Sequence, residues 1–234
     1  MTAPIVPAGE HLAPAVEVLE GGGLVISPTT TNYNILCDAT NPDAVARVFQ
    51  VKERVKVAPL PVSLPQPSMI PTYVEVPDGF DTSIFDAMLP GEVSFVFWQR
   101  YPFPDQLTCG LHTVAVSVTT HPVMRSMVVG LGGPIAATSA NVSGQGNVFI
   151  PLARAIEEVG DRVDLIVDAG ATAAELAPDH ANRVNTIVDL TFDKPRLVRP
   201  GWVSLEEVRK YLPDVDDDLD AYKALLAERT GAGA

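Results

Sequence analysis

The run of small polar residues from Thr138 to Gly144 holds the most specific arrangement of reactive or ligand-binding groups in the chain. The residues Ile135 to Thr138 are typical of a short buried strand, which would open directly into Ser139 and Asn141. Hydroxyl groups, a side-chain amide and free backbone N–H groups would then gather at the carboxyl end of a sheet, where α/β folds bind ligands. Such clusters suit the oxygens of phosphates and carboxylates. The alternative is a turn whose groups bond only to one another.

Two further segments carry candidate groups. Lys52, Arg54 and Lys56 follow one another at the expected C-terminus of a helix. Fixed cations there could bind a triphosphate and neutralise the charge that develops on it. The helix dipole also favours cations at this end, which is the alternative explanation. The third segment, Ser27 to Thr30, is again a strand end followed by hydroxyl groups, and by itself it predicts only a loop.

The elements that would position these groups alternate at the length scale of α/β proteins. One helix is predicted to begin with Asn41 as its N-cap and Pro42 as its first residue, and to end near Arg54. Further helices are expected at 11–20, 80–88, 121–129, 204–211 and 221–228, and strands at 24–27, 59–64, 93–98, 114–118 and 135–138. Residues 152–159, 165–167 and 186–190 continue the alternation.

The end of the chain differs from the rest in composition. The stretch from Asp214 to Asp220 is rich in aspartate and precedes the last expected helix. A solvated hinge explains such a run better than a metal site does. The sequence therefore predicts one domain at 1–212 and an acidic hinge with a helical tail at 213–234.

Charge and composition exclude several classes of protein. The 234 residues include 16 Lys+Arg and 29 Asp+Glu, for a net charge of -13. Such a surface repels nucleic acid and anionic membranes, so any phosphate site must be a local concentration of cations and N–H groups. The sequence contains no phosphate-loop motif, no serine-hydrolase elbow and no histidine pair at metal-ligand spacing. Without a signal peptide or a membrane span, the expected location is the cytoplasm.

In their order along the chain, these segments resemble the YrdC family, whose members make threonylcarbamoyl-adenylate from threonine, bicarbonate and ATP. The resemblance covers roughly residues 9–208, and its most specific part is Ser-Ala-Asn-x-Ser-Gly at 139–144. The other matching segments are 22–29, 37–39, 52–54, 59–60, 89–91, 114–116, 121–122, 185–189 and 197–201.

The resemblance implies a fold and a set of roles. The fold would be a YrdC-like twisted mixed sheet with flanking helices around a concave, positively lined cavity. Lys52 and Arg54 would be catalytic and bind the triphosphate. The rest of the nucleotide site would consist of Thr113, Ser139, Asn141, Ser143 and Arg199, and Ser139 and Asn141 would also meet Mg²⁺. The substrate side would consist of Thr29, Ser63, Ser117, Thr138 and Asn185, with bicarbonate as co-substrate and a small amine or amino acid as partner.

The substrate side also departs from the family pattern. The family has Arg where this chain has Ser117, and His where it has Ser63. A hydroxyl group does not replace the paired, charge-assisted bonds that Arg makes to a carboxylate. The family's Pro-Thr-Glu ends here in Thr30, its Pro-Gly-Pro ends in Glu92, and its Ser-Thr begins with Asn185. The nucleotide side is mostly kept, whereas the amine side is mostly changed.

Two hypotheses follow from this pattern. In the first, the protein forms a carbamoyl-adenylate but accepts an amine other than threonine, or passes the carbamoyl group to a dedicated acceptor. In the second, it is a non-catalytic relative that binds a nucleotide, RNA or a protein partner. The net charge of -13 disfavours RNA unless the cavity alone is basic.

Overall fold

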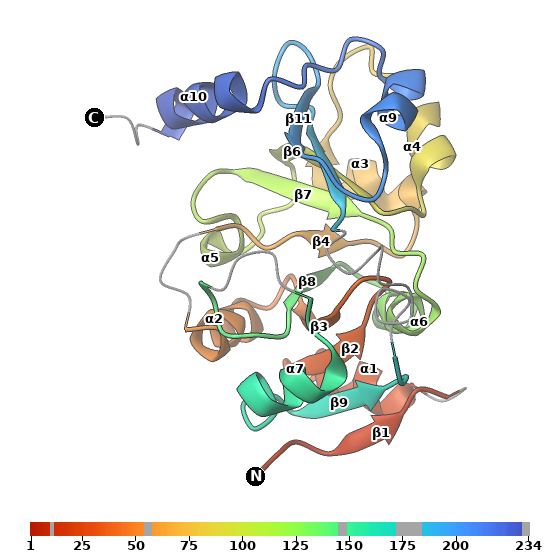
Figure 1. Cartoon of the computed structure of the whole chain (residues 1–234), viewed down its shortest axis with the longest axis vertical. Coiled ribbons are helices and arrows are strands. Elements are labelled where there is room, and N and C mark those ends of the chain that lie inside the picture. Colours follow the sequence, from red (N-terminus) through yellow and green to blue (C-terminus); the bar gives the residue numbers. More distant parts are fainter. Residues whose placement is uncertain (10–11, 54–57, 145–148, 172–183, 231–234) are drawn as a thin grey trace.

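The computed structural model describes residues 1–9, 12–53, 58–144, 149–171 and 184–230 of the chain. Within these ranges, an 11-stranded sheet forms the centre of the molecule, and helices lie on both of its faces (Figure 1). The sheet is twisted and contains both parallel and antiparallel neighbours. The predicted mixed α/β fold is therefore confirmed.

The strands, in chain order, are β1 Ile5–Pro7, β2 Val25–Pro28, β3 Tyr33–Asp38, β4 Val62–Ser63, β5 Val74–Glu75, β6 Val93–Gln99, β7 Thr113–Ser117, β8 Ile135–Ser139, β9 Leu165–Asp168, β10 Thr186–Asp189 and β11 Arg196–Arg199. Their spatial order is β1-β9-β2-β3-β8-β4-β7-β6-β10-β11, and β5 pairs with β6 outside this path. The pairs β1–β9, β2–β9, β4–β7 and β6–β10 are parallel, and the other pairs are antiparallel.

The helices are α1 Ala13–Glu20, α2 Pro42–Val51, α3 Ile70–Tyr73, α4 Ser83–Met88, α5 Asp105–Thr108, α6 Pro122–Leu131, α7 Leu152–Val159, α9 Leu205–Tyr211 and α10 Leu219–Thr230, with a 3₁₀ turn at Pro67–Met69. The start of α2 has the predicted geometry, because the Asn41 side-chain oxygen accepts bonds from the N–H groups of Asp43 at 3.0 Å and Ala44 at 3.1 Å. These donors have no partner inside the helix. The helix ends earlier than predicted, at Val51, so Lys52 is its C-cap residue.

The sequence predicts no strand at Tyr33–Asp38, where the structure has β3. The polar residues before it form a tight turn, in which the Thr29 N–H group donates to the Asn32 carbonyl oxygen at 2.8 Å. This turn joins β2 and β3 as an antiparallel pair, with Pro28 opposite Tyr33. The polar run is thus the tip of a hairpin, and it places Thr29 just beyond the end of β2.

Apolar side chains cover the two faces of the sheet differently. On the lower strands of Figure 1, Leu36 and Ile135 pack with Leu19 of α1 and Met127 of α6. On the upper strands, Phe85 of α4 packs on the opposite face of the sheet, against two aromatic residues of β6. Its ring centroid lies 6.0 Å from that of Phe95 and 5.7 Å from that of Phe97. The helices α1 and α6 therefore cover one face of the sheet at the lower strands, and they leave the same face uncovered at the upper strands.

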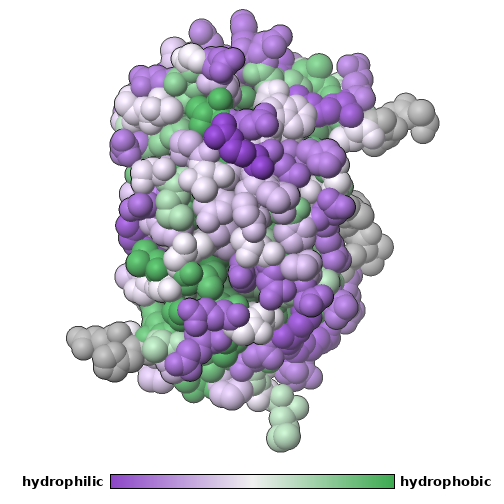
Figure 2. Space-filling model, turned by 180° about the vertical axis from the view of Figure 1, so that it is seen from behind, coloured by the Kyte–Doolittle hydropathy of each residue, from purple (hydrophilic) through white to green (hydrophobic). Residues whose placement is uncertain are grey.

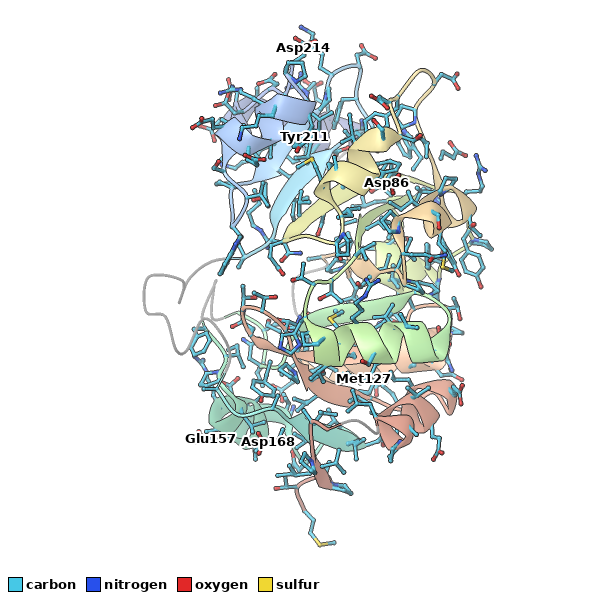
Figure 3. All side chains as sticks on the ribbon, turned by 90° about the vertical axis from the view of Figure 1, so that its right-hand side faces the viewer. Asp86, Met127, Glu157, Asp168, Tyr211 and Asp214 are labelled. Atoms are coloured by element: carbon cyan, nitrogen blue, oxygen red, sulfur yellow. The ribbon has the colours of Figure 1, made fainter. Side chains whose placement is uncertain are left out.

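The residues labelled in Figure 3 lie in one or the other of these two halves. Figure 3 shows Asp86 and Tyr211 in the upper half, and Met127, Glu157 and Asp168 in the lower half. Seen from behind, the surface is mainly hydrophilic, with hydrophobic residues in small groups (Figure 2). Among the described residues, no helix has both the length and the apolar character needed to cross a lipid bilayer.

The acidic run before α10 contacts the body of the protein. Arg196 forms an ion pair with Asp216 at 2.7 Å, and the Leu197 N–H group donates to the Asp216 carbonyl oxygen at 2.8 Å. Arg209 pairs with Asp217 at 3.0 Å. Four of the five aspartates of the run are exposed to solvent, as its charge predicts, while arginines of β11 and α9 pair with Asp216 and Asp217. The division into 1–212 and 213–234 stays a prediction.

Candidate functional site

A cavity of about 970 Å³ lies on the face of β6, β7 and β10 that α1 and α6 leave uncovered. Side chains alternate along a strand, so every second residue of β6 faces this cavity and the residues between them enter the core. The cavity-facing residues of these strands are Ser94, Val96, Trp98, Thr113, Ala115, Ser117, Ile187 and Asp189. Most of them are small, and this leaves room for a ligand over the sheet.

The structure brings most of the predicted site residues to this one cavity. Those that line it are Thr29, Ser63, Thr113, Ser117, Thr138, Ser139, Asn185 and Arg199. Lys52 and Asn141 are buried next to Ser139, and Ser143 is connected to them through its N–H group, which donates to the Lys52 carbonyl oxygen at 2.8 Å. Arg54 lies outside the described residues. The positions agree with a single site, while the role of each residue stays a prediction.

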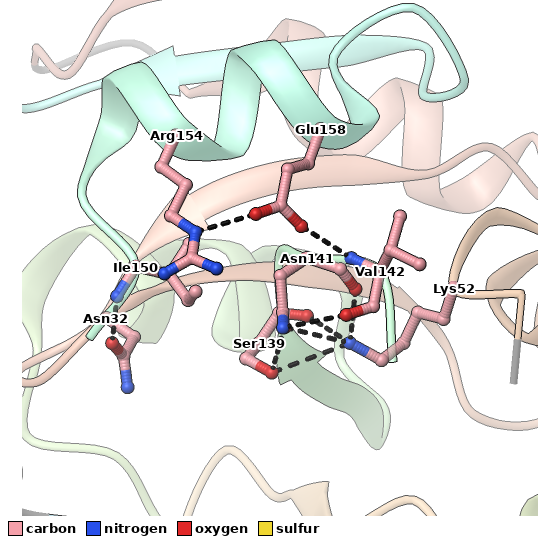
Figure 4. Close-up of polar contacts among 8 residues, drawn as sticks. All are labelled: Asn32, Lys52, Ser139, Asn141, Val142, Ile150, Arg154 and Glu158. Atoms are coloured by element: carbon pink, nitrogen blue, oxygen red, sulfur yellow. Dashed lines mark hydrogen bonds and ion pairs between the residues drawn. The ribbon is translucent and has the colours of Figure 1, made fainter. Parts of the chain in front are cut away.

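Lys52 is buried, with 3% of its surface exposed, and its ammonium group points to the turn after β8 (Figure 4). Its Nζ donates to the carbonyl oxygen of Ser139 at 2.5 Å and to that of Asn141 at 2.8 Å. The side-chain oxygens of Asn141 and Ser139 lie 3.3 Å and 3.5 Å from Nζ. The helix dipole alone does not explain this cation, because its ammonium group bonds to the turn at 139–141.

The turn itself also contains internal hydrogen bonds. The Ser139 hydroxyl group donates to Asn141 Oδ1 at 2.6 Å, and Asn141 Nδ2 donates to the Val142 carbonyl oxygen at 2.9 Å. The self-bonded turn that the sequence left open is thus part of the arrangement. Ser139 nevertheless lines the cavity, so the turn presents to the cavity a hydroxyl group whose position is fixed by Asn141 and Lys52.

A second support of this turn is Glu158 of α7, which sequence analysis missed. Its Oε2 accepts the Val142 N–H group at 2.9 Å, and its Oε1 accepts a bond from Arg154 Nε at 2.6 Å (Figure 4). Arg154 and Glu158 are spaced i, i+4 on one helix, a pattern that predicts their ion pair. Nothing in the sequence connects that pair with Val142.

The side-chain oxygens of the predicted Mg²⁺ ligands, Ser139 and Asn141, already have hydrogen-bond partners in this arrangement, and their role toward Mg²⁺ stays a prediction. Their side-chain oxygens bond to each other at 2.6 Å, and the Lys52 ammonium group already supplies a positive charge to both. In the described part of the chain, no group of three or more His, Cys, Asp or Glu side chains could hold a metal ion.

The expected amine end of the cavity is built from uncharged groups and one carboxylate. Ser63 and Ser117 lie side by side on the parallel pair β4–β7. The Ser117 hydroxyl group donates to the Val62 carbonyl oxygen at 3.4 Å, while the buried Ser63 hydroxyl group has no partner among the described residues. Glu92 also lines the cavity, and its Oε1 accepts hydrogen bonds from two threonine hydroxyl groups, each at 2.7 Å.

Arg199 occupies the side of the cavity next to Asn185. Its Nε and Nη2 donate to the Asn185 carbonyl oxygen at 3.2 Å and 2.9 Å. Burial lowers the pKa of this guanidinium group, and an arginine side chain remains charged at neutral pH. The described lining carries two carboxylates, Glu92 and Asp189, beside the arginines Arg199 and Arg229. A positive lining is therefore not shown.

The far end of the cavity is formed by residues that the sequence did not indicate. Tyr222 and Arg229 of α10 line it together with Trp98. Arg229 lies over the Trp98 ring, with Cζ 5.0 Å from the ring centroid. The Tyr222 hydroxyl group donates to Asp189 Oδ2 at 3.1 Å, and burial together with the nearby Asp189 charge raises the pKa of Tyr222. The C-terminal helix is thus part of the cavity wall.

Comparison with known proteins gives consistent matches. The family model Sua5_yciO_yrdC, described as telomere recombination, matches residues 17–201. A candidate threonylcarbamoyl-AMP synthase of Mycobacterium tuberculosis is 34% identical over 85% of this chain and 87% of its own length. The threonylcarbamoyl-AMP synthase of Bos taurus is 31% identical over 82% of this chain and 68% of its own. The structure of Pyrococcus abyssi Sua5 complexed with L-threonine has a TM-score of 0.79 at 27% identity and covers 92% of this chain, which in turn covers only 63% of that one.

Proposed function

This chain belongs to the Sua5/YciO/YrdC family, and we propose that it catalyses the ATP-dependent formation of a carbamoyl-adenylate from a carboxylated amine. The relatives named threonylcarbamoyl-AMP synthase support an enzyme of this kind, as in the modification of tRNA. The observation that carries the proposal is the cavity that gathers Thr113, Ser139 and Arg199, with the Lys52 charge directly beneath Ser139.

The proposed reaction has two steps. The neutral amine nitrogen attacks the carbon of bicarbonate, and loss of water leaves a carbamate. A carbamate oxygen then attacks the α-phosphorus of ATP, the bond from this phosphorus to the bridging oxygen of the β-phosphate breaks, and pyrophosphate leaves. Both steps require anions held in position and neutralised rather than a covalent nucleophile. Mg²⁺ bound to the triphosphate would supply further neutralisation of charge.

The nucleotide side of the cavity fits these requirements. Lys52 and Arg199 provide positive charge next to hydroxyl groups of Thr113 and Ser139, which can bond to phosphate or ribose oxygens. We assign Arg54 and Ser143 to the same side on the family resemblance. The Lys52 ammonium group is fixed by carbonyl oxygens, so its charge needs no reorganisation when a phosphate arrives.

The amine side supports a changed specificity. Thr29, Thr138 and Asn185 offer neutral hydrogen-bonding groups, as do Ser63 and Ser117. An α-carboxylate such as that of threonine would therefore find hydroxyl groups where a guanidinium group is needed for paired, charge-assisted bonds. We propose that threonine is a poor substrate of this protein.

One observation favours a second candidate, a module that binds a nucleotide without turning it over. The Lys52 ammonium group bonds to protein carbonyl oxygens, and only 3% of the residue's surface is exposed. A cation held in this way stabilises the turn at 139–141 whether or not chemistry follows.

The two candidates differ in the release of pyrophosphate. With ATP, Mg²⁺ and bicarbonate, we expect release that depends on an added amine, with poor turnover of L-threonine. The mass of the adenylate product identifies the amine used. If no amine in a broad panel supports pyrophosphate release, the binding module is favoured. Efficient release with L-threonine would refute the changed specificity.

A further inference from the structure

One carboxylate at the amine end of the cavity, that of Glu92, is held in place by two separate segments. Glu92 Oε1 accepts a hydrogen bond at 2.7 Å from Thr30 Oγ1, in the turn between β2 and β3. It accepts a second bond at 2.7 Å from Thr120 Oγ1, which follows β7. The two threonine oxygens are 3.4 Å apart, so they approach the same carboxylate oxygen from neighbouring positions.

The backbone around Glu92 is fixed as well. The Gly91 N–H group donates to the Val118 carbonyl oxygen at 3.0 Å, and the Glu92 carbonyl oxygen accepts the Thr186 N–H group at 3.0 Å. The backbone that carries the Glu92 side chain is therefore held by hydrogen bonds to two other segments. Two hydroxyl groups bind one carboxylate oxygen, and no described residue donates a hydrogen bond to the other, Oε2.

The described cations of the cavity have other partners. Arg199 donates to the Asn185 carbonyl oxygen. Arg229 lies with Cζ 3.7 Å from the Phe192 ring centroid and bonds to the Thr191 hydroxyl group at 2.7 Å. Thr120 follows Ser117 by three residues, so the Cα atoms of these two residues are at most roughly 10 Å apart, given the rise per residue of a strand, and Thr120 bonds to the carboxylate. This distance is within the span of a small substrate.

We propose that Glu92 selects an amine that carries a second, cationic nitrogen and no carboxylate. The inference rests on the proposed carbamoyl-adenylate chemistry and names the class of its amine. The neutral nitrogen attacks bicarbonate, while the protonated nitrogen donates a charge-assisted hydrogen bond to Glu92. A substrate carboxylate at the same place would meet a like charge, with only hydroxyl groups of Ser63 and Ser117 beside it.

Three substrates that differ in one group test this inference. They are L-threonine, the alcohol in which CH₂OH replaces its carboxylate, and the diamine in which an aminomethyl group replaces it. With the full chain, ATP, Mg²⁺ and bicarbonate, kcat/KM for pyrophosphate release is expected to be highest for the diamine and lowest for L-threonine. Glu92→Gln is expected to lower kcat/KM for the diamine by about tenfold or more, mainly through KM, and to change the alcohol by less than about twofold.

Two further variants separate specificity from folding. Thr120→Val removes a hydroxyl group that orients the carboxylate but keeps the charge, so we expect a smaller loss in the same direction. Glu75→Gln removes an exposed carboxylate elsewhere and should leave all three substrates unchanged. A uniform loss with all substrates in Glu92→Gln, or a wild type that prefers L-threonine, overturns the inference and leaves the proposed function standing. If none of the three substrates supports pyrophosphate release, the inference is overturned, and the proposed function is overturned with it when the broad amine panel also gives no release.

Discussion

At the residue scale, the turn at 139–142 is held from two sides. Lys52 donates to the carbonyl oxygens of Ser139 and Asn141 from the end of α2, and Glu158 of α7 accepts the Val142 N–H group. A buried ammonium group is tolerated only with such partners, because desolvation of a charge is costly. The wall of the cavity at Ser139 is therefore fixed before any ligand arrives.

Loss of Glu158 should disturb this wall. Glu158→Ala leaves the half-buried Val142 N–H group without its acceptor, which costs about 1–3 kcal/mol of unfolding free energy. We also expect a higher KM for ATP, because Ser139 is no longer held in one position. Urea unfolding and the KM for ATP measure the two effects. Glu157→Ala, an exposed change on the same helix, is the control, and equal behaviour of the two variants would contradict the role of Glu158.

The sequence predicts Ser139 and Asn141 because consecutive small polar residues after an apolar strand are visible locally. It does not predict Glu158, whose partner Val142 is 16 residues away. It gives Glu92 only as a departure from the family pattern, since its threonine partners lie 62 and 28 residues away. Contacts of this kind depend on the strand order, which local pattern does not determine.

At the element scale, the C-terminal helix α10 forms part of the cavity wall. Tyr222 and Arg229 lie in the wall, and Tyr222 donates a hydrogen bond to Asp189 of β10. Asp189 is 2% exposed, so its carboxylate depends on such donors. The acidic run before α10 is paired with Arg196 and Arg209, which holds the helix against β11.

Tyr222→Phe removes the donor to Asp189 and should lower the unfolding free energy at pH 7 by about 1–3 kcal/mol. The pKa of Tyr222 is raised above its ordinary value of 10.0 in the folded state. The unfolded state therefore releases this proton first, and stability falls as the pH rises above about 10 in the wild type. Tyr222→Phe has no phenolic proton at this position, so its stability lacks the part of the fall above about pH 10 that Tyr222 causes.

Thermal melting at pH 7 and between pH 9 and about 11 measures both effects of the Tyr222 change. Tyr211→Phe is the matched control, because no described residue bonds to the Tyr211 hydroxyl group. A Tyr222→Phe protein as stable as this control would show that α10 is only loosely attached.

Element boundaries were predictable where the signal is local. The cap at Asn41 and the strands β6, β7 and β8 agree with their patterns. The strand β3 escaped prediction because its continuous apolar run is only three residues long and follows a tight polar turn. The strand β11 escaped prediction because its arginines obscure a short apolar pattern. The function of α10 depends on its position against β10 and β11, which no local signal gives.

At the scale of the whole molecule, a net charge of -13 surrounds the cavity that we propose as the ATP site. The cations Lys52 and Arg199 are buried or partly buried, so salt screens them much less than surface charges. The acidic exterior makes wide contact with nucleic acid unfavourable, because non-specific affinity comes from neutralised phosphates. The fold thus favours a small anionic ligand in the cavity over a polyanion on the surface.

The central claim is that this cavity binds ATP through the turn anchored by Lys52. The most direct measurement is the melting temperature of the wild type and of Lys52→Ala as ATP with Mg²⁺ is titrated. A ligand that binds only the native state stabilises it by about 2.7 kcal/mol at one hundred times Kd. We predict a rising melting temperature for the wild type and a much weaker rise, relative to its own starting value, for Lys52→Ala. A flat titration of the wild type up to millimolar ATP, or equal shifts in both proteins, would contradict the account.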